Sequence, residues 1–290
     1  MSFGNGKKYH SRIKDKIIDN KPIKIKKMKK IFLAMAVLAM LFSGCKKENN
    51  TVENLSEKIM GMWIMTDKNG HPLPTNEKFV YTFVSDTKAY VSASITTHPE
   101  TGTFWNDQLE TDVTISDNKM MLTGHPNEHT TVMEYYTVTA INDSEFTANY
   151  EVTVTIDGNV AGNETMVLRF VKVKVNYKPE VIGFWECKEL TGIETFNDVN
   201  ARLMFYYDGT YKYWTKNADG EWQPVTTREF QDYFVDGTLL ATRWKNVGED
   251  ELREWWEITS IADNQMEWTA LRQNPDGSIV RQGAKWKKIK

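Results

Sequence analysis

The side chains best suited to metal chemistry are four histidines, His71, His98, His125 and His129. Imidazole is a common metal ligand, and the short segment between His125 and His129 would let both rings reach one divalent ion. Three of the four precede proline in polar segments, where solvent-exposed histidine is common. A metal site and exposed loop histidines therefore remain alternatives.

Other catalytic signatures are absent from the sequence. It contains no nucleophile elbow, Gly-rich phosphate loop, Cys-x-x-Cys pair or His-Glu-x-x-His motif. Carboxylates are frequent, but no motif pairs them, and we expect Glu254 and Glu257, beside Trp255-Trp256, to be solvated strand positions. The sequence therefore predicts neither enzymatic activity nor a cofactor.

Tryptophan is concentrated in the second half of the chain, which holds eight of the ten tryptophans. Aromatic side chains that face the interior of a small β-barrel either fill it or line an apolar pocket. The residues expected to line a pocket for a small apolar or amphipathic ligand are Trp256, Ile258, Met266, Trp268 and Phe205. In the alternative, the barrels are filled and outer aromatics such as Trp222 and Trp255 contact a glycan or a protein.

The elements that position these side chains occur in two copies. Ile59–Trp63 and Val181–Trp185 both contain Gly-x-Trp and lie 122 residues apart. Glu134–Ile141 matches Glu254–Ile261 at a spacing of 120 residues, and further segments match in the same order. Self-similarity at a fixed long period indicates a duplicated structural unit.

Alternation of apolar and polar residues predicts β-strands throughout both copies, most clearly from Phe146 to Ile156. The first copy has predicted strands near 59–66, 78–85, 88–97, 103–116 (interrupted), 119–124, 131–141, 145–156 and 164–175. The second has them near 181–188, 200–207, 210–216, 222–234, 238–245, 252–261, 265–273 and 279–289. No segment shows helical periodicity.

This pattern predicts an all-β protein with two tandem eight-stranded antiparallel up-and-down barrels, at residues 56–177 and 178–290. A β-sandwich is the alternative. In the first barrel, the histidine loops follow odd-numbered strands and should share one end. The turns around Asp86, Asp117 and Asp143 should lie at the other end.

Gly-x-Trp on the first strand of an eight-stranded barrel resembles the lipocalin signature, in which the tryptophan closes one barrel end beside a basic residue of the last strand. The matching positions here are Gly61, Trp63 and Arg169, and Gly183, Trp185 and Lys285. Both copies are shorter than most lipocalins and lack their C-terminal helix. They are more similar to the compact lipocalin-like domains of bacterial lipoproteins, which implies a barrel that binds a small ligand.

The N-terminus carries an export signal. A basic cluster at 26–30 precedes twelve apolar residues, 31–42, too few for the roughly 20 that span a bilayer. Ser43-Gly44-Cys45 resembles the lipobox of bacterial lipoproteins, although Phe42 stands where leucine is usual. The resemblance implies that residues 1–44 are removed and that Cys45 is lipidated, and a plain signal peptide is the alternative.

Met28 would make an ordinary start for this signal peptide, and polar residues 45–55 would form a flexible tether. We therefore expect an exported protein that is lipid-anchored in the cell envelope, in the outer membrane of a Gram-negative bacterium.

Charge and cysteine usage exclude two further possibilities. Residues 55–290 hold 23 Lys and Arg against 35 Asp and Glu, which argues against nucleic acid as a partner because phosphate binding needs a basic surface. Cys187 is the only cysteine besides Cys45, so a lipidated Cys45 leaves no internal disulfide. Cys187 follows Trp185 on the same strand face, where we expect a buried, inert thiol.

Overall fold

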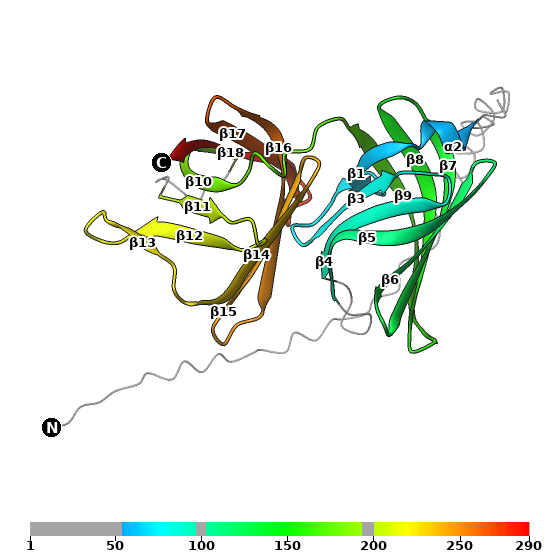
Figure 1. Cartoon of the computed structure of the whole chain (residues 1–290), viewed down its shortest axis with the longest axis horizontal. Helices are drawn as coiled ribbons and strands as arrows, with labels where there is room; N and C mark the ends of the chain where they lie inside the picture. The colour runs from blue at the N-terminus through cyan, green and yellow to red at the C-terminus, as the bar shows by residue number, and fades with distance from the viewer. Residues whose placement is uncertain (1–53, 97–102, 193–199, 290) are drawn as a thin grey trace, which may run out of the picture. The chain divides into compact units, whose positions relative to one another are not determined.

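The computed structural model describes residues 54–96, 103–192 and 200–289 (Figure 1). The expected signal peptide, Cys45 and His98 lie outside these ranges. The described residues form two antiparallel β-sheets, one from each sequence copy. The helix α2 (Leu55–Lys58) precedes the first strand and corrects the expectation of no helix, and its Leu55 is buried. No helix within the described ranges combines the length and the apolar character needed to cross a bilayer.

The first sheet closes into a barrel. Its main strands are β1 (Gly61–Lys68), β3 (Glu77–Phe83), β4 (Lys88–Thr96), β5 (Thr103–Ser116), β6 (Lys119–Asn127), β7 (Thr130–Ile141), β8 (Glu145–Ile156) and β9 (Asn159–Val173), and β2 (His71–Pro72) is a short addition beside β1. Neighbouring strands pair in chain order, and β9 pairs with β1 from Leu168↔Lys68 to Val173↔Met62. The eight-stranded barrel is therefore confirmed for the first copy.

Strand β5 runs without a break from Thr103 to Ser116, although the sequence predicted an interruption there. The irregularity takes the form of a bulge instead. The register against β4 shifts between Val91 and Ala93, and Gln108 has φ 62° while its N–H donates to the Ser92 hydroxyl. A bulge of this kind bends the strand and keeps the ladder on both sides.

The second sheet is curled and, within the described residues, open, so the closure predicted for the second barrel is not shown. Its strands are β10 (Gly183–Thr191), β11 (Arg202–Phe205), β12 (Tyr211–Lys216), β13 (Trp222–Pro224), β14 (Arg228–Asp236), β15 (Leu239–Asn246), β16 (Glu251–Ala262), β17 (Gln265–Gln273) and β18 (Ile279–Ile289). They run in the order β13-β12-β11-β10-β18-β17-β16-β15-β14, and no ladder joins β13 to β14 in the described part. A single bridge, Thr210↔Asp232, connects the two sides of the opening.

The opening arises where the sequence predicted one continuous strand over 222–234. Pro224 ends β13, because proline has no N–H with which to continue a ladder. β13 then pairs with β12, whereas β14 pairs with β15. The predicted strand is thus divided between the two edges of the sheet.

Both copies place the Gly-x-Trp tryptophan in the same way. The indole Nε1 of Trp63 donates to the Ile59 carbonyl at 2.6 Å, and that of Trp185 donates to the Val181 carbonyl at 2.7 Å. Both rings are fully buried. Each tryptophan therefore ties the chain just before the first strand to its sheet.

The basic residue over each tryptophan differs from the expected one. The ammonium of Lys172 lies 4.8 Å from the Trp63 ring centroid, and that of Lys288 lies 5.0 Å from the Trp185 ring centroid. Each lysine is the direct cross-strand partner of its tryptophan. Arg169 and Lys285, the positions implied by the resemblance, occur three residues earlier in the strand.

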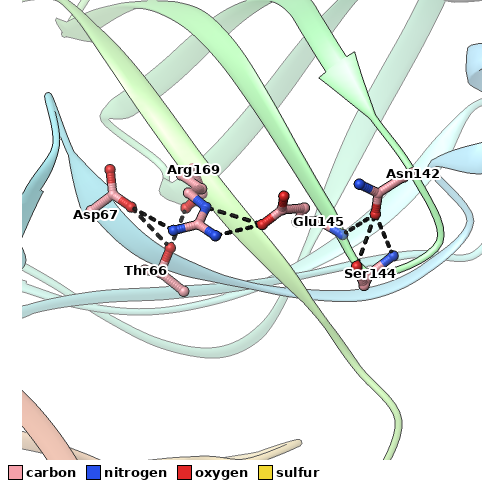
Figure 2. A network of polar contacts seen from close by, with 6 residues as sticks. All are labelled: Thr66, Asp67, Asn142, Ser144, Glu145 and Arg169. Atoms are coloured by element: carbon pink, nitrogen blue, oxygen red, sulfur yellow. Dashed lines mark hydrogen bonds and ion pairs between the residues drawn. The ribbon is translucent and has the colours of Figure 1, made fainter.

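Arg169 instead forms a polar network on the outside of the barrel (Figure 2). Its Nη2 pairs with Glu145 Oε2 at 2.5 Å, its Nη1 lies 4.0 Å from Asp67, and Thr66 donates to its carbonyl at 3.2 Å. The network links β9 to β8 and β1, and half of the arginine side chain is exposed. Exposed pairs of this kind contribute little stability. Lys285 forms the matching pair with Glu189 at 2.9 Å in the second copy.

The described residues from 54 to 289 belong to one compact unit, in which the two sheets share polar contacts. Lys78 is fully buried, and its ammonium pairs with Glu257 at 2.6 Å. The Trp255 indole donates to the Pro74 carbonyl at 2.6 Å, and Arg253 donates to the carbonyl of Phe104 at 2.6 Å. The expectation that Trp255 faces outward is therefore wrong, because the first sheet covers this face of β16, and Glu257, whose side chain is 31% exposed, is only partly solvated.

Candidate ligand-binding site in the first barrel

The first barrel encloses a cavity of about 470 Å³. Its wall comes from alternate positions of the strands, because successive side chains of a strand point to opposite faces. The wall is predominantly apolar and includes Phe79, Val91, Ile95, Phe104, Leu109 and Val152. Cavities of about 300–1,000 Å³ with apolar walls and a few polar groups are typical of small-molecule sites.

Three charged residues lie at the mouth of the cavity. Lys68, at the end of β1, pairs with Glu77 at 3.2 Å and with Glu164 at 3.7 Å. The opposite end is closed by the buried Trp63 and by Leu55 of α2. The barrel interior is therefore reached from the end where β1, β6 and β8 finish.

The described histidines belong to the connections at this same end. His71 lies in β2 directly after β1, and His125 and His129 lie at the hairpin that joins β6 to β7. This placement agrees with the strand-order prediction for the described histidines.

The histidine side chains do not converge on a metal site. His125 Nδ1 contacts the Thr131 hydroxyl at 3.2 Å, whereas His129 Nδ1 contacts Asp157 at 2.8 Å. Glu128 lies 3.3 Å from the other ring nitrogen of His129, so the two carboxylates bind opposite sides of one imidazole. Within the described ranges, no group of three or more His, Cys, Asp or Glu side chains is placed to hold a metal ion.

A buried carboxylate forms the polar part of the cavity. Glu134 on β7 is only 7% exposed, and its Oε1 accepts hydrogen bonds from three tyrosine hydroxyls. Tyr81 and Tyr150 donate at 2.8 Å, and Tyr136 donates at 3.3 Å. Tyr81 is the cross-strand neighbour of Trp63, which places this cluster toward the closed end of the barrel.

The cluster keeps its tyrosines protonated. Burial, followed by the neighbouring Glu134 carboxylate, raises the pKa of Tyr81, Tyr136 and Tyr150 well above the ordinary tyrosine value. Burial also raises the pKa of Glu134, and the three hydrogen bonds oppose that shift. The hydroxyls thus act as donors to Glu134 across the physiological pH range.

Within the described residues, Oε2 of Glu134 has no hydrogen-bond partner. All of its hydrogen bonds within the described part of the chain reach Oε1, and no lysine or arginine there forms an ion pair with it. Sequence reasoning missed this residue because Glu134 reads as one carboxylate among many. Two features of the sequence could have identified it. Glu134 and Tyr136 alternate onto the inner face of β7, and Tyr81 and Tyr150 occupy inner positions on other strands.

The residues expected to line a pocket in the second sheet pack against one another instead. Trp256 and Trp268 stack with ring centroids 5.6 Å apart, and Ile258 is the cross-strand neighbour of Trp268. Met266 is fully buried opposite Trp286, and Phe205 is fully buried 4.8 Å from the Tyr233 ring. None of the five expected residues lines the first-barrel cavity.

Two further expectations concern the second copy. Cys187 is buried as predicted, and burial raises the pKa of its thiol to about 11, which makes it unreactive. Trp222 is partly buried, and the guanidinium of Arg202 lies 4.0 Å from its ring centroid. One face of this ring is therefore already occupied by a cation, which weakens the case for sugar stacking there.

No family model and no curated protein matches the chain. Solved structures with similar features share little sequence with it. A protein of unknown function of the DUF3598 family from Nostoc punctiforme is 8% identical, with 81% of this chain and 97% of that chain covered and a TM-score of 0.26. A candidate outer membrane protein from Bacteroides fragilis is 11% identical, with coverages of 81% and 99% and a TM-score of 0.20.

A point mutant of the vaccine antigen transferrin binding protein B from Haemophilus parasuis is 8% identical, with 79% of this chain and 75% of that chain covered and a TM-score of 0.21. TM-scores this low carry no argument about function or location. The chain is thus a two-sheet antiparallel β-protein with a closed first barrel, and its function must be argued from its own residues.

Proposed function

We propose that this protein binds a small, predominantly apolar ligand inside its first barrel and holds it at the cell envelope through a lipid anchor. The observation that carries the binding proposal is the cavity of about 470 Å³, which is reached from one barrel end and has an apolar wall. The proposal keeps the ligand class expected from the sequence but moves the site from the second copy to the first.

The lining of the site favours a ligand with an apolar body. Apolar side chains from β3, β4, β5 and β8 surround the cavity, and burying apolar surface supplies about 25 cal/mol per Å². The ion-paired residues Lys68, Glu77 and Glu164 at the mouth provide a polar edge. A fully polar ligand would lose its hydration without regaining enough hydrogen bonds from this wall.

Filling the cavity tests the proposal directly. Ala93 is 4% exposed and lines the cavity, so Ala93→Phe would place a phenyl ring inside it. The matched control is Ala140→Phe, because Ala140 is an exposed residue of β7. The assay is the fluorescence of N-phenyl-1-naphthylamine, which increases when the probe enters an apolar site.

We expect the wild-type chain and Ala140→Phe to bind the probe equally and Ala93→Phe to bind it at least about tenfold more weakly. Circular dichroism would verify that both variants fold. Equal binding by all three chains would contradict a site in the first barrel. Native mass spectrometry of freshly purified protein would then show whether a small molecule co-purifies with the chain.

The envelope location rests on the N-terminal sequence. The basic cluster, the twelve apolar residues and Ser43-Gly44-Cys45 support lipid attachment at Cys45, and stable anchoring requires more than one acyl chain. Mass spectrometry of the membrane-fractionated protein should find a multiply acylated Cys45. An unmodified Cys45 in that fraction would refute the anchor and leave the binding proposal unaffected.

A further inference from the structure

We infer that the ligand of the first barrel carries an amine, and that the ammonium group of this amine binds Glu134 beside Tyr81 and Tyr150. This inference rests on the proposed function, since it names the head group of a ligand that the cavity holds. The ligand class is an alkyl or otherwise apolar amine.

The cluster around Glu134 presents hydrogen-bond acceptors to the cavity. A tyrosine hydroxyl has one proton to donate, and the hydroxyls of Tyr81 and Tyr150 both donate theirs to Glu134 Oε1 at 2.8 Å. The hydroxyl oxygens and Glu134 Oε2 are then left with acceptor capacity only. Glu134, Tyr81 and Tyr150 all line the cavity, so they present acceptors to its interior. A ligand head group must therefore be a donor.

The charge of Glu134 also favours a cationic head group. Glu134 is buried, and no lysine or arginine of the described residues neutralises it. A buried carboxylate without a counter-ion is unfavourable, and an ammonium group both neutralises it and supplies up to three donors. A hydroxyl supplies one donor without charge, and a carboxylate ligand would bring a second negative charge.

The charged residues at the mouth of the cavity also favour a cationic ligand. Lys68 is accompanied there by two carboxylates, Glu77 and Glu164, which leaves a net negative charge. Negative charge at the entrance of a low-dielectric cavity attracts cations and repels anions. Entry and anchoring therefore select the same sign of ligand charge.

The test compares three ligands that share one tail, namely decylamine, 1-decanol and decanoate, by isothermal titration calorimetry with the full chain at neutral pH. We expect decylamine to bind about tenfold or more tightly than 1-decanol, since a hydrogen bond to a charged group is stronger than a neutral one. Decanoate should bind most weakly.

The decisive variant is Glu134→Gln, which keeps the shape and an acceptor oxygen but removes the charge. This substitution should weaken the binding of decylamine about tenfold or more and change the affinity for 1-decanol less than about threefold. The matched control is Glu151→Gln, because Glu151 is an exposed carboxylate on the neighbouring strand β8. The control should leave all three affinities unchanged.

The outcomes separate this inference from the proposed function. Equal binding of the three decyl compounds, or equal weakening of all three by Glu134→Gln, would overturn the amine inference while the binding function stands. If no decyl compound and no naphthylamine probe binds, the proposed function itself fails. If Glu134→Gln does not fold, the order of the three ligands on the wild-type chain decides the inference alone.

Discussion

The hydrogen bond from Tyr150 to Glu134 offers a direct measure of the buried carboxylate. Tyr150 is 9% exposed, and its hydroxyl lies 2.8 Å from Glu134 Oε1. Tyr150→Phe removes only this hydroxyl. A hydrogen bond to a charged group contributes about 1.5–3 kcal/mol, whereas one between neutral groups contributes about 0.5–1.5 kcal/mol. We therefore expect Tyr150→Phe to cost about 1.5–3 kcal/mol of unfolding free energy at neutral pH.

A double-mutant cycle isolates the charge. In the Glu134→Gln background, the same Tyr150→Phe substitution should cost only about 0.5–1.5 kcal/mol, so the two sites should be coupled by about 1 kcal/mol. Tyr135→Phe is the control, because Tyr135 is 39% exposed on the same strand as Glu134. It should change the free energy of unfolding by less than about 0.5 kcal/mol.

The assay is urea denaturation followed by hydrogen exchange of peptides from β7 and β8, which reports on the first barrel separately from the second sheet. Repeating it at several pH values adds a second check. Because burial raises the folded-state pKa of Glu134, the wild-type chain should lose stability as pH rises from the ordinary glutamate value through the raised one. Glu134→Gln should lack that loss. Equal Tyr150→Phe costs in both backgrounds would refute the picture of a charged acceptor.

Two further predictions concern the second sheet and its contact with the first. Gly183→Ala should cost about 1–3 kcal/mol, because φ is +129° and the added Cβ would lie 2.5 Å from Lys288 Cε. The control in urea denaturation is Gly220→Ala, which measures the backbone strain alone, because φ is +81° and no atom lies within 4 Å of the added Cβ. Equal costs for Gly183→Ala and Gly220→Ala would contradict a role for the lysine contact. Glu257→Gln should cost about 3–5 kcal/mol at neutral pH, since it leaves the buried Lys78 ammonium without its partner, and adding Lys78→Met should recover most of that loss. Burial lowers the pKa of Lys78 in the folded chain, so between that lowered pKa and the ordinary lysine value the unfolded chain holds a proton that the folded chain has lost. The cost of Glu257→Gln should therefore shrink as pH rises toward the ordinary lysine value. A cost that does not change with pH would refute this account.

The local pattern of the sequence determined the elements. The two copies and nearly all strands could be predicted, because alternation of apolar and polar residues is a property of neighbours in the chain. The predicted strand 145–156 agrees with β8, and 265–273 agrees with β17. The turns and the order of strands then sufficed to place the described histidines at one barrel end.

Register and closure needed the tertiary structure. The pairing of β9 with β1 places Lys172 directly opposite Trp63, whereas Arg169 lies opposite Asp67, beyond a bulge between Met65 and Asp67. Sequence matching could not separate the two, because both basic residues recur in the second copy at the same relative positions, as Lys285 and Lys288. Pairing between distant strands decides such a choice, and a shift in register changes which side chains meet.

The location of the cavity was likewise decided only in three dimensions. The tryptophans of the second sheet look like a pocket lining in the sequence, yet Trp256 and Trp268 fill space by stacking on each other. Glu134 looks like a solvated strand residue, yet Tyr81 and Tyr150 enclose it from other strands. Whether inward side chains fill a barrel or leave it hollow depends on the sum of their volumes around the closed sheet, and no local sequence pattern records that sum.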